Sequence, residues 1–193
     1  MPGIVGVILT MTMIMFTSMA IVRERERGTL EQIMVTPVRP SVLILGKILP
    51  FAMFGLVEFG LALVVGAYLF DMPLRGNLGL LVFATVLYLL TTLGMGMLIS
   101  TLSGSQQQAF MGGFFFMLPA ALLSGIMTPI HSMPRWLQPL TQVNPLRHYT
   151  EVLRALLLRG ASLHDLQRQL LTLGCIGIVV FTIAVLRFRK SVG

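Results

Sequence analysis

The chain has 193 residues, of which 55% are hydrophobic and only 11% are charged, and its mean hydropathy is +0.88. A soluble domain carries about 25% charged residues, so this composition excludes an ordinary soluble protein and indicates a polytopic membrane protein. The net charge of +7 does not point to nucleic acid, because much of the basic excess lies beside apolar segments, where anionic headgroups attract it.

Five segments are apolar enough over about 20 residues to cross a bilayer. Unpaired backbone groups are too costly in hydrocarbon, and no alternating strand pattern occurs, so these segments are expected to be helices. The sequence therefore predicts an all-α fold with a single transmembrane domain over residues 1–193. The expected spans are 3–22, 48–70, 78–100, 109–129 and 170–186.

The charges beside the first span predict the orientation. No basic segment precedes residues 3–22, no small-residue cleavage site follows them, and arginines follow directly, which argues against a signal peptide. This pattern puts the N-terminus outside, and the loop 23–47 and the C-terminus in the cytoplasm. The cytoplasmic side then carries eight of the 14 Lys and Arg residues, including both Lys. The region 130–169 lies on the outer side of the membrane.

The cytoplasmic loop begins as a continuation of the first helix. Arg23, Glu24, Glu26 and Arg27 form opposite-charge pairs three residues apart, so the helix can extend into water. Gly28 is a suitable residue to end it, because glycine readily adopts the left-handed conformation found just after helices. We expect the chain to bend at this glycine.

A second, short helix is predicted after the bend. Thr29 and Gln32 have capping-box spacing, Pro37 ends the helix, and Pro40 begins the helix into the second span. Three apolar side chains share one face of the short helix: Leu30, Ile33 and Met34. One interpretation is that the loop only orients the protein; the other is that its apolar face docks into a groove on another protein.

Glu58 falls near the middle of the second span, where a carboxylate is costly. One interpretation places it on a translocation pathway or at a dimer seam, where it would attract cationic substrates. The other makes it a hydrogen-bonded group that fixes helix packing. A proton relay is not expected, because no second titratable group lies within a span.

The outer region is broken into short pieces by Pro129, Pro134 and Pro139, and Trp136 suits the headgroup layer. Further along, Asn144 is positioned to cap a helix with Pro145 at its first position. Five more residues complete the local pattern: Arg147 and Glu151 are an i,i+4 pair, Gly160 ends the helix, and Ser162 with Asp165 begins the next.

Two blocks of this sequence carry a family resemblance. The run Arg23-Glu-Arg-Glu-Arg-Gly-Thr-Leu-Glu-Gln-Ile-Met-Val-Thr-Pro, with Leu45-Gly-Lys, resembles the coupling-helix region of ABC-2 type permeases, the membrane subunits of bacterial ABC exporters. The runs Leu123-Ser-Gly-Ile-Met-Thr-Pro-Ile and Asn144-Pro-Leu-Arg-His-Tyr resemble that family's last extracytoplasmic re-entrant region. The blocks bracket nearly the whole chain and are closest to the drug-export branch.

The resemblance implies a transport subunit of the bacterial inner membrane that is not itself an enzyme. A second permease copy, identical or different, and an ABC ATPase are the implied partners, and a periplasmic adaptor is a further option. ATP and Mg²⁺ would bind the ATPase, with no cofactor on this chain, which lacks the G-x-x-x-x-G-K-[ST] motif. A further span and an extracytoplasmic domain are expected ahead of Met1.

Carried onto this sequence, the family roles give two sets of site residues. Contact with the ATPase is expected from Glu24, Arg25, Glu26, Arg27, Gly28, Thr29, Leu30, Glu31 and Gln32. An outer gate is expected from Met127, Thr128, Pro129, Asn144 and Pro145, although structural support of the bundle is an equally good interpretation of that region.

The expected function is export of drugs or other amphipathic molecules. The alternatives are an ATPase-independent channel or secondary carrier, and a scaffold without transport. Secondary carriers tend to show internal repeats and ion ligands at mid-membrane, whereas this sequence shows no obvious repeat and only Glu58. No metal site is expected, because His131, His148 and His164 lack metal-ligand spacing and Cys175 has no companion.

Overall fold

A computed structural model of the chain describes residues 2–28, 40–70, 76–126 and 130–192. Within these ranges every regular element is helical, which confirms the all-α class. The α-helices are α1 (Pro2–Glu26), α3 (Pro40–Phe70), α4 (Leu78–Leu102), α5 (Gln106–Leu122), α6 (Gln138–Gln142), α7 (Pro145–Arg154) and α8 (Leu163–Val192). A 3-10 turn covers Ile130–Ser132, and a π-helical turn, Ala155–Arg159, continues α7.

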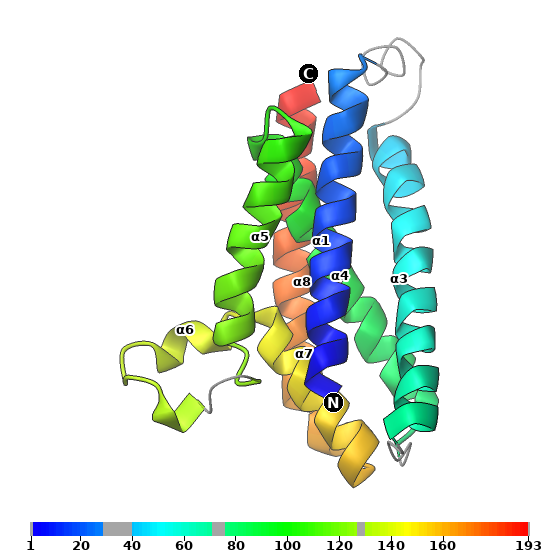
Figure 1. Ribbon diagram of the computed structural model, residues 1–193, viewed down its shortest axis with the longest axis vertical. Helices are drawn as coiled ribbons and strands as arrows, with labels where there is room; N and C mark the ends of the chain where they lie inside the picture. Colours follow the sequence, from blue (N-terminus) through cyan, green and yellow to red (C-terminus); the bar gives the residue numbers. More distant parts are fainter. Residues whose placement is uncertain (1, 29–39, 71–75, 127–129, 193) are drawn as a thin grey trace.

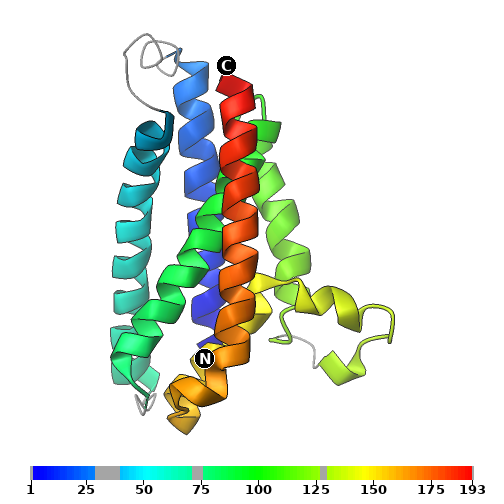
Figure 2. The same ribbon diagram turned by 180° about the vertical axis from the view of Figure 1, so that it is seen from behind.

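The long helices α1, α3, α4, α5 and α8 run side by side, with the two chain ends at opposite ends of the bundle (Figure 1). The helix α4 crosses the bundle obliquely and packs mainly against α8 and α1, and Figure 2 shows α8 lying over it from behind. The helices α6 and α7 gather at the end where α1 begins. We call this the α1-start end, and the opposite one the α1-finish end.

Four helices of the described residues are long and apolar enough to span a membrane: Pro2–Glu26, Leu45–Phe70, Leu78–Leu102 and Leu163–Phe188. The chain is therefore a multi-pass membrane protein. The predicted span 109–129 forms α5, which has only 17 residues and rises about 26 Å at 1.5 Å per residue. The hydrocarbon core is about 30 Å thick, so α5 is short for a full crossing.

The predicted end of the fourth span was wrong, because α5 ends at Leu122 and not near residue 129. Ser124 Oγ donates to the carbonyl oxygen of Ala121 at 2.6 Å and accepts the Ile126 N–H at 3.3 Å, which draws the chain into a turn. Gly125 follows with a φ of 76°, a conformation that other residues rarely adopt. The Ser-Gly dipeptide was the turn signal in the sequence.

The last helix also differs from its predicted span. Residues 170–186 are only the central part of α8, which runs Leu163–Val192. The sequence reasoning counted the apolar stretch, whereas the helix starts where Ser162 N and Oγ both bond Asp165 Oδ2, at 3.0 and 2.9 Å. The predicted helix start at Pro40 is confirmed.

The central helices α1 and α4 approach closely at Gly96. A Cβ atom added there would lie 2.9 Å from Thr17 Cβ and 3.1 Å from the Ile14 carbonyl oxygen, both on α1. Small residues at such crossings let two helix backbones approach and pack in the absence of a hydrophobic driving force. The absence of a side chain at Gly96 thus fixes the distance between α1 and α4.

Gly96→Val is expected to destabilise the folded protein by about 1–3 kcal/mol, because the new side chain overpacks the α1–α4 contact. The measurement is thermal unfolding of the purified protein in detergent. Gly60→Val is the matched control, since nothing lies within 4 Å of a Cβ at that position in α3. Equal melting temperatures for the two variants would contradict this account of the packing.

Candidate functional site

The C-terminal turn of α1 is bonded to the start of α5. The Glu26 carboxylate accepts the backbone N–H of Gln106 at 3.0 Å and its side-chain Nε2 at 2.5 Å. Arg23 Nε donates to Gln106 Oε1 at 3.2 Å. The first N–H groups of a helix have no partner within it and carry partial positive charge. A carboxylate from α1 therefore completes the first turn of α5.

The same turn of α1 also contacts α3 and α4. Lys47 Nζ forms an ion pair with Glu24, which joins α3 to α1. Arg25 Nη1 donates to the carbonyl oxygens of Ser100 and Ser103 at 3.4 Å each. These carbonyls lie at the C-terminal end of α4, where backbone acceptors lack partners within the helix.

Together these contacts hold four helix ends in one place. Single exposed ion pairs contribute about 0–1 kcal/mol, but here most of the bonds also satisfy backbone groups or amides at helix ends. We call this set the helix-end junction: Arg23, Glu24, Arg25, Glu26, Lys47 and Gln106. It lies at the α1-finish end of the bundle, where α1 stops and α3 begins.

The predicted stop of α1 is confirmed. The helix ends at Glu26 and Gly28 has a φ of 68°, with its N–H bonded to the Arg25 carbonyl at 3.1 Å. Arg27 is exposed, and its side chain forms no hydrogen bond or ion pair among the residues that the structure describes. The other predicted coupling residues, Thr29, Leu30, Glu31 and Gln32, lie outside the described residues.

Glu58 lies at the contact between α3 and α1. Thr12 Oγ1 is 2.8 Å from both carboxylate oxygens, and the same hydroxyl is 2.9 Å from the Ile8 carbonyl oxygen. Next to this pair, the rings of Phe16 and Phe54 meet edge to face with centroids 6.0 Å apart. The Thr12 hydroxyl thus gives the Glu58 carboxylate a hydrogen-bond partner on another helix. This bond supports the interpretation that Glu58 fixes helix packing.

At the α1-start end, Asn144 joins α5 to α7. Its Oδ1 accepts the Leu146 N–H at 3.1 Å, which confirms the predicted cap, and Pro145 is the first residue of α7. Its Nδ2 donates to the Ala120 carbonyl at 2.6 Å, and the side chain is only 7% exposed. Ala120 lies in the last turn of α5, where carbonyls lack helical partners. The other predicted gate residues, Met127, Thr128 and Pro129, lie outside the described residues.

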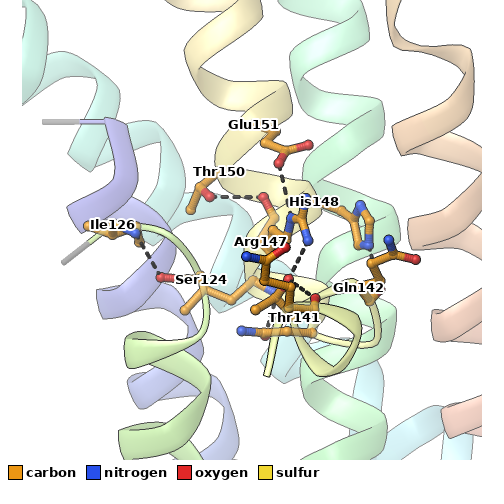
Figure 3. A network of polar contacts seen from close by, with 11 residues as sticks. Ser124, Ile126, Thr141, Gln142, Arg147, His148, Thr150 and Glu151 are labelled. Carbon is orange, nitrogen blue, oxygen red and sulfur yellow. Dashed lines mark hydrogen bonds and ion pairs between the residues drawn. The ribbon is translucent and has the colours of Figure 1, made fainter. Parts of the chain in front are cut away.

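A polar network continues from this cap along α7, and Figure 3 shows Arg147 between Thr141 and Glu151. The predicted pair is confirmed, with Arg147 Nε 3.1 Å from Glu151 Oε1. Arg147 Nη1 also donates to Thr141 Oγ1. The His148 ring nitrogen Nε2 lies 2.7 Å from the Gln142 carbonyl oxygen. The first turn of α7 is thereby tied to α6.

The sequence reasoning missed a buried tyrosine pair between α4 and α7. The rings of Tyr88 on α4 and Tyr149 on α7 stack with centroids 4.0 Å apart, and both residues are 0% exposed. The Tyr88 hydroxyl bonds Thr10, and the Tyr149 hydroxyl bonds Thr85 at 3.0 Å. Buried tyrosines usually find a hydroxyl partner, so Tyr88 within an apolar span was the available signal.

An apolar groove of 370 Å³ lies between α5 and α8, with α4 as its floor. Near the α1-start end it is closed by Leu140, Val143, Asn144 and Pro145. Two of the predicted gate residues therefore form one wall of this groove. The space and its lining suit a hydrocarbon chain or the apolar part of an amphipathic molecule.

The chain belongs to the ABC-2 type transporter family, because its residues 1–158 match the model of that family. It is 38% identical over 191 residues to the probable multidrug ABC transporter permease YbhR of Escherichia coli K12, covering 99% of this chain and 52% of that protein.

Two further relatives come from the same strain. The chain is 36% identical over 194 residues to the inner membrane transport permease YhhJ, covering 99% of this chain and 52% of that protein. It is 37% identical over 163 residues to the probable multidrug ABC transporter permease YbhS, covering 82% of this chain and 42% of that protein. The chain thus spans about half the length of these curated relatives.

Asn144→Ala is expected to destabilise the protein by about 2 kcal/mol, because it removes a helix cap and leaves a buried carbonyl unpaired. Thermal unfolding in detergent measures the effect. Asn77→Ala is the matched control, since Asn77 caps α4 from an exposed position with a single bond to the Gly79 N–H at 2.8 Å. If Asn144→Ala lowers the stability no more than Asn77→Ala does, the bond from Asn144 to the Ala120 carbonyl does not contribute to stability.

Proposed function

We propose that this chain is the membrane permease subunit of an ABC exporter, driven by a separate ATPase that binds ATP and Mg²⁺. Family membership supports the transporter class, and the names of the YbhR and YbhS relatives support drugs or other amphipathic molecules as cargo. The observation that carries the proposal is the helix-end junction, because it connects both flanks of the predicted coupling segment to the bundle.

The proposed topology has five spans, with α5 as a short fourth crossing of the bacterial inner membrane. The N-terminus then lies outside and the C-terminus in the cytoplasm, in line with the opposite positions of the two chain ends (Figure 1). The helix-end junction faces the cytoplasm, and α6 and α7 lie at the outer boundary as re-entrant or amphipathic helices. Exposed Trp136 on that side suits the headgroup layer.

The proposed mechanism uses α5 as a strut between the two ends of the bundle. A push from the ATPase on the segment after Gly28 reaches α1 and α3, which the Glu24–Lys47 ion pair holds together. Glu26 passes the displacement to Gln106 at the start of α5. At the far end of that helix, Asn144 is bonded to the Ala120 carbonyl, so the displacement arrives at α7.

The outer end is proposed to act as a gate for the apolar groove. Asn144 and Pro145 lie both in the wall of the groove and at the joint between α5 and α7. A movement of α5 relative to α7 therefore changes the end of the groove. Such a switch between two states is the usual form of alternating access, and the ATPase supplies the free-energy difference.

A second permease copy, identical or different, is proposed to complete the pathway. Large apolar side chains of α1 and α5 remain exposed in the single chain, namely Ile4, Ile8, Met11, Phe110, Phe114 and Leu118. Either lipid or a second copy can cover such a surface. Under this arrangement Glu58, which is half-buried between α1 and α3, acts chiefly in helix packing.

An ATPase-independent channel or carrier is the competing function. Secondary carriers place ion ligands on unwound helices at mid-membrane. In the described residues the long helices are continuous, and Glu58 is bonded to a threonine hydroxyl of α1. These observations favour an externally driven permease.

Arg27→Glu is expected to abolish co-purification with the proposed ABC ATPase partner. Arg27 is exposed next to the bend, and its side chain forms no hydrogen bond or ion pair in the described part of the chain, so reversal changes the docking surface and leaves the bundle intact. Arg154→Glu is the matched control, because it makes the same charge change at an exposed position of α7. Normal co-purification of the Arg27 variant would count against docking at this bend.

A further inference from the structure

A polar pocket lies between α7 and α8 at the α1-start end, separate from the apolar groove. Its volume of 230 Å³ is several times the share of one water molecule, about 30 Å³. The residues that line it include Arg147, His148, Glu151, Arg168 and Gln169. A pocket with so many polar side chains is unusual in a chain in which only 11% of residues are charged.

The charge in the pocket is positive. Two guanidinium groups and one carboxylate line it, which leaves a net charge of +1 with His148 neutral. Arg147 uses two of its N–H groups for Glu151 and Thr141 and keeps the others available. The Arg168 side chain is exposed and has no partner among the residues that the structure describes. The pocket therefore offers guanidinium donors to an anion.

Gln169 adds a further unsatisfied group. Its Oε1 atom is buried and has no hydrogen-bond partner in the described part of the chain. A buried acceptor without a partner destabilises the folded state. A half turn of the amide exchanges its oxygen for its NH₂ group, which then donates to an anion beside the two arginines.

The position of the pocket relative to the membrane surface indicates which anion it binds. The first turns of α7 pack against Gly6, near the start of α1, where a Cβ atom would lie 3.0 Å from Leu146 and 3.3 Å from Tyr149. Exposed Trp136 and Leu140 lie on the neighbouring segment, and such side chains favour the layer between hydrocarbon and water. The anions concentrated in that layer are the phosphodiesters of phospholipids.

We propose that the pocket between α7 and α8 binds the phosphodiester of a phospholipid headgroup. Arg168 and Arg147 supply charge-assisted hydrogen bonds to the phosphate oxygens, a geometry that guanidinium groups form well. The bound lipid fastens α7, which carries Asn144, to the start of α8. This site does not depend on the transport role and stands or falls separately from it.

The test is native mass spectrometry of the full chain with phosphatidylglycerol, and with diacylglycerol of the same acyl chains as the phosphate-free probe. Phosphatidylglycerol is expected to bind and diacylglycerol is not. Arg168→Gln is expected to weaken phosphatidylglycerol binding about tenfold, the loss of one charged hydrogen bond. Arg154→Gln, an equal charge change on α7 outside the pocket, is expected to leave binding unchanged.

Three results would overturn the proposal. Equal binding of diacylglycerol would mean that the phosphate is not recognised. Equal weakening by Arg168→Gln and Arg154→Gln, or no weakening by either, would mean that general surface charge or the acyl chains hold the lipid. Displacement of the lipid by excess inorganic phosphate would assign the pocket to a soluble anion. Matching thermal unfolding curves for both variants and the parent verify that the fold is intact.

Discussion

Hydrocarbon offers no hydrogen-bond partner to a hydroxyl, an amide or a carboxylate, so each such group in this bundle needs a partner from the chain itself. Most of the described buried Ser and Thr hydroxyls meet this requirement with a carbonyl of their own helix, whereas a smaller set of polar side chains bonds across helices. Tyr88 and Tyr149 bond threonines of α1 and α4, Glu58 on α3 bonds Thr12, and Asn144 bonds a carbonyl of α5. These pairings fix which helices are neighbours in a core whose apolar contacts alone have little direction.

The same requirement explains why the two ends of α5 are the connection points of the structure. A helix leaves N–H groups unpaired at its start and carbonyls unpaired at its finish. Glu26 satisfies the first end from α1, and Asn144 satisfies the second from the start of α7. A short helix held by polar bonds at both ends transmits displacement, whereas a helix held only by apolar side chains can slide. The proposed strut follows from this difference.

The features predicted correctly are those set by local sequence. Gly28, the Asn144 cap and the Arg147–Glu151 pair each depend on residues within four positions, and the structure has all three. The features missed join distant parts of the chain: Gln106 lies 80 positions from Glu26, and Tyr88 meets Tyr149. The residues that neighbour a glutamine or tyrosine in the sequence do not indicate its distant partner in the fold. The end of α5 was missed for a different reason, because an apolar run continues past the Ser-Gly turn that ends the helix.

The central claim is that α5 carries displacement from the helix-end junction to the gate. Pulsed electron paramagnetic resonance tests it most directly, with spin labels at exposed Val143 and Leu171 in a Cys175→Ser background, in complex with the ATPase. The account predicts that ATP changes the distance between the labels. It also predicts that Gln106→Ala abolishes this change while ATP hydrolysis continues. An unaltered change in the Gln106 variant would contradict the claim.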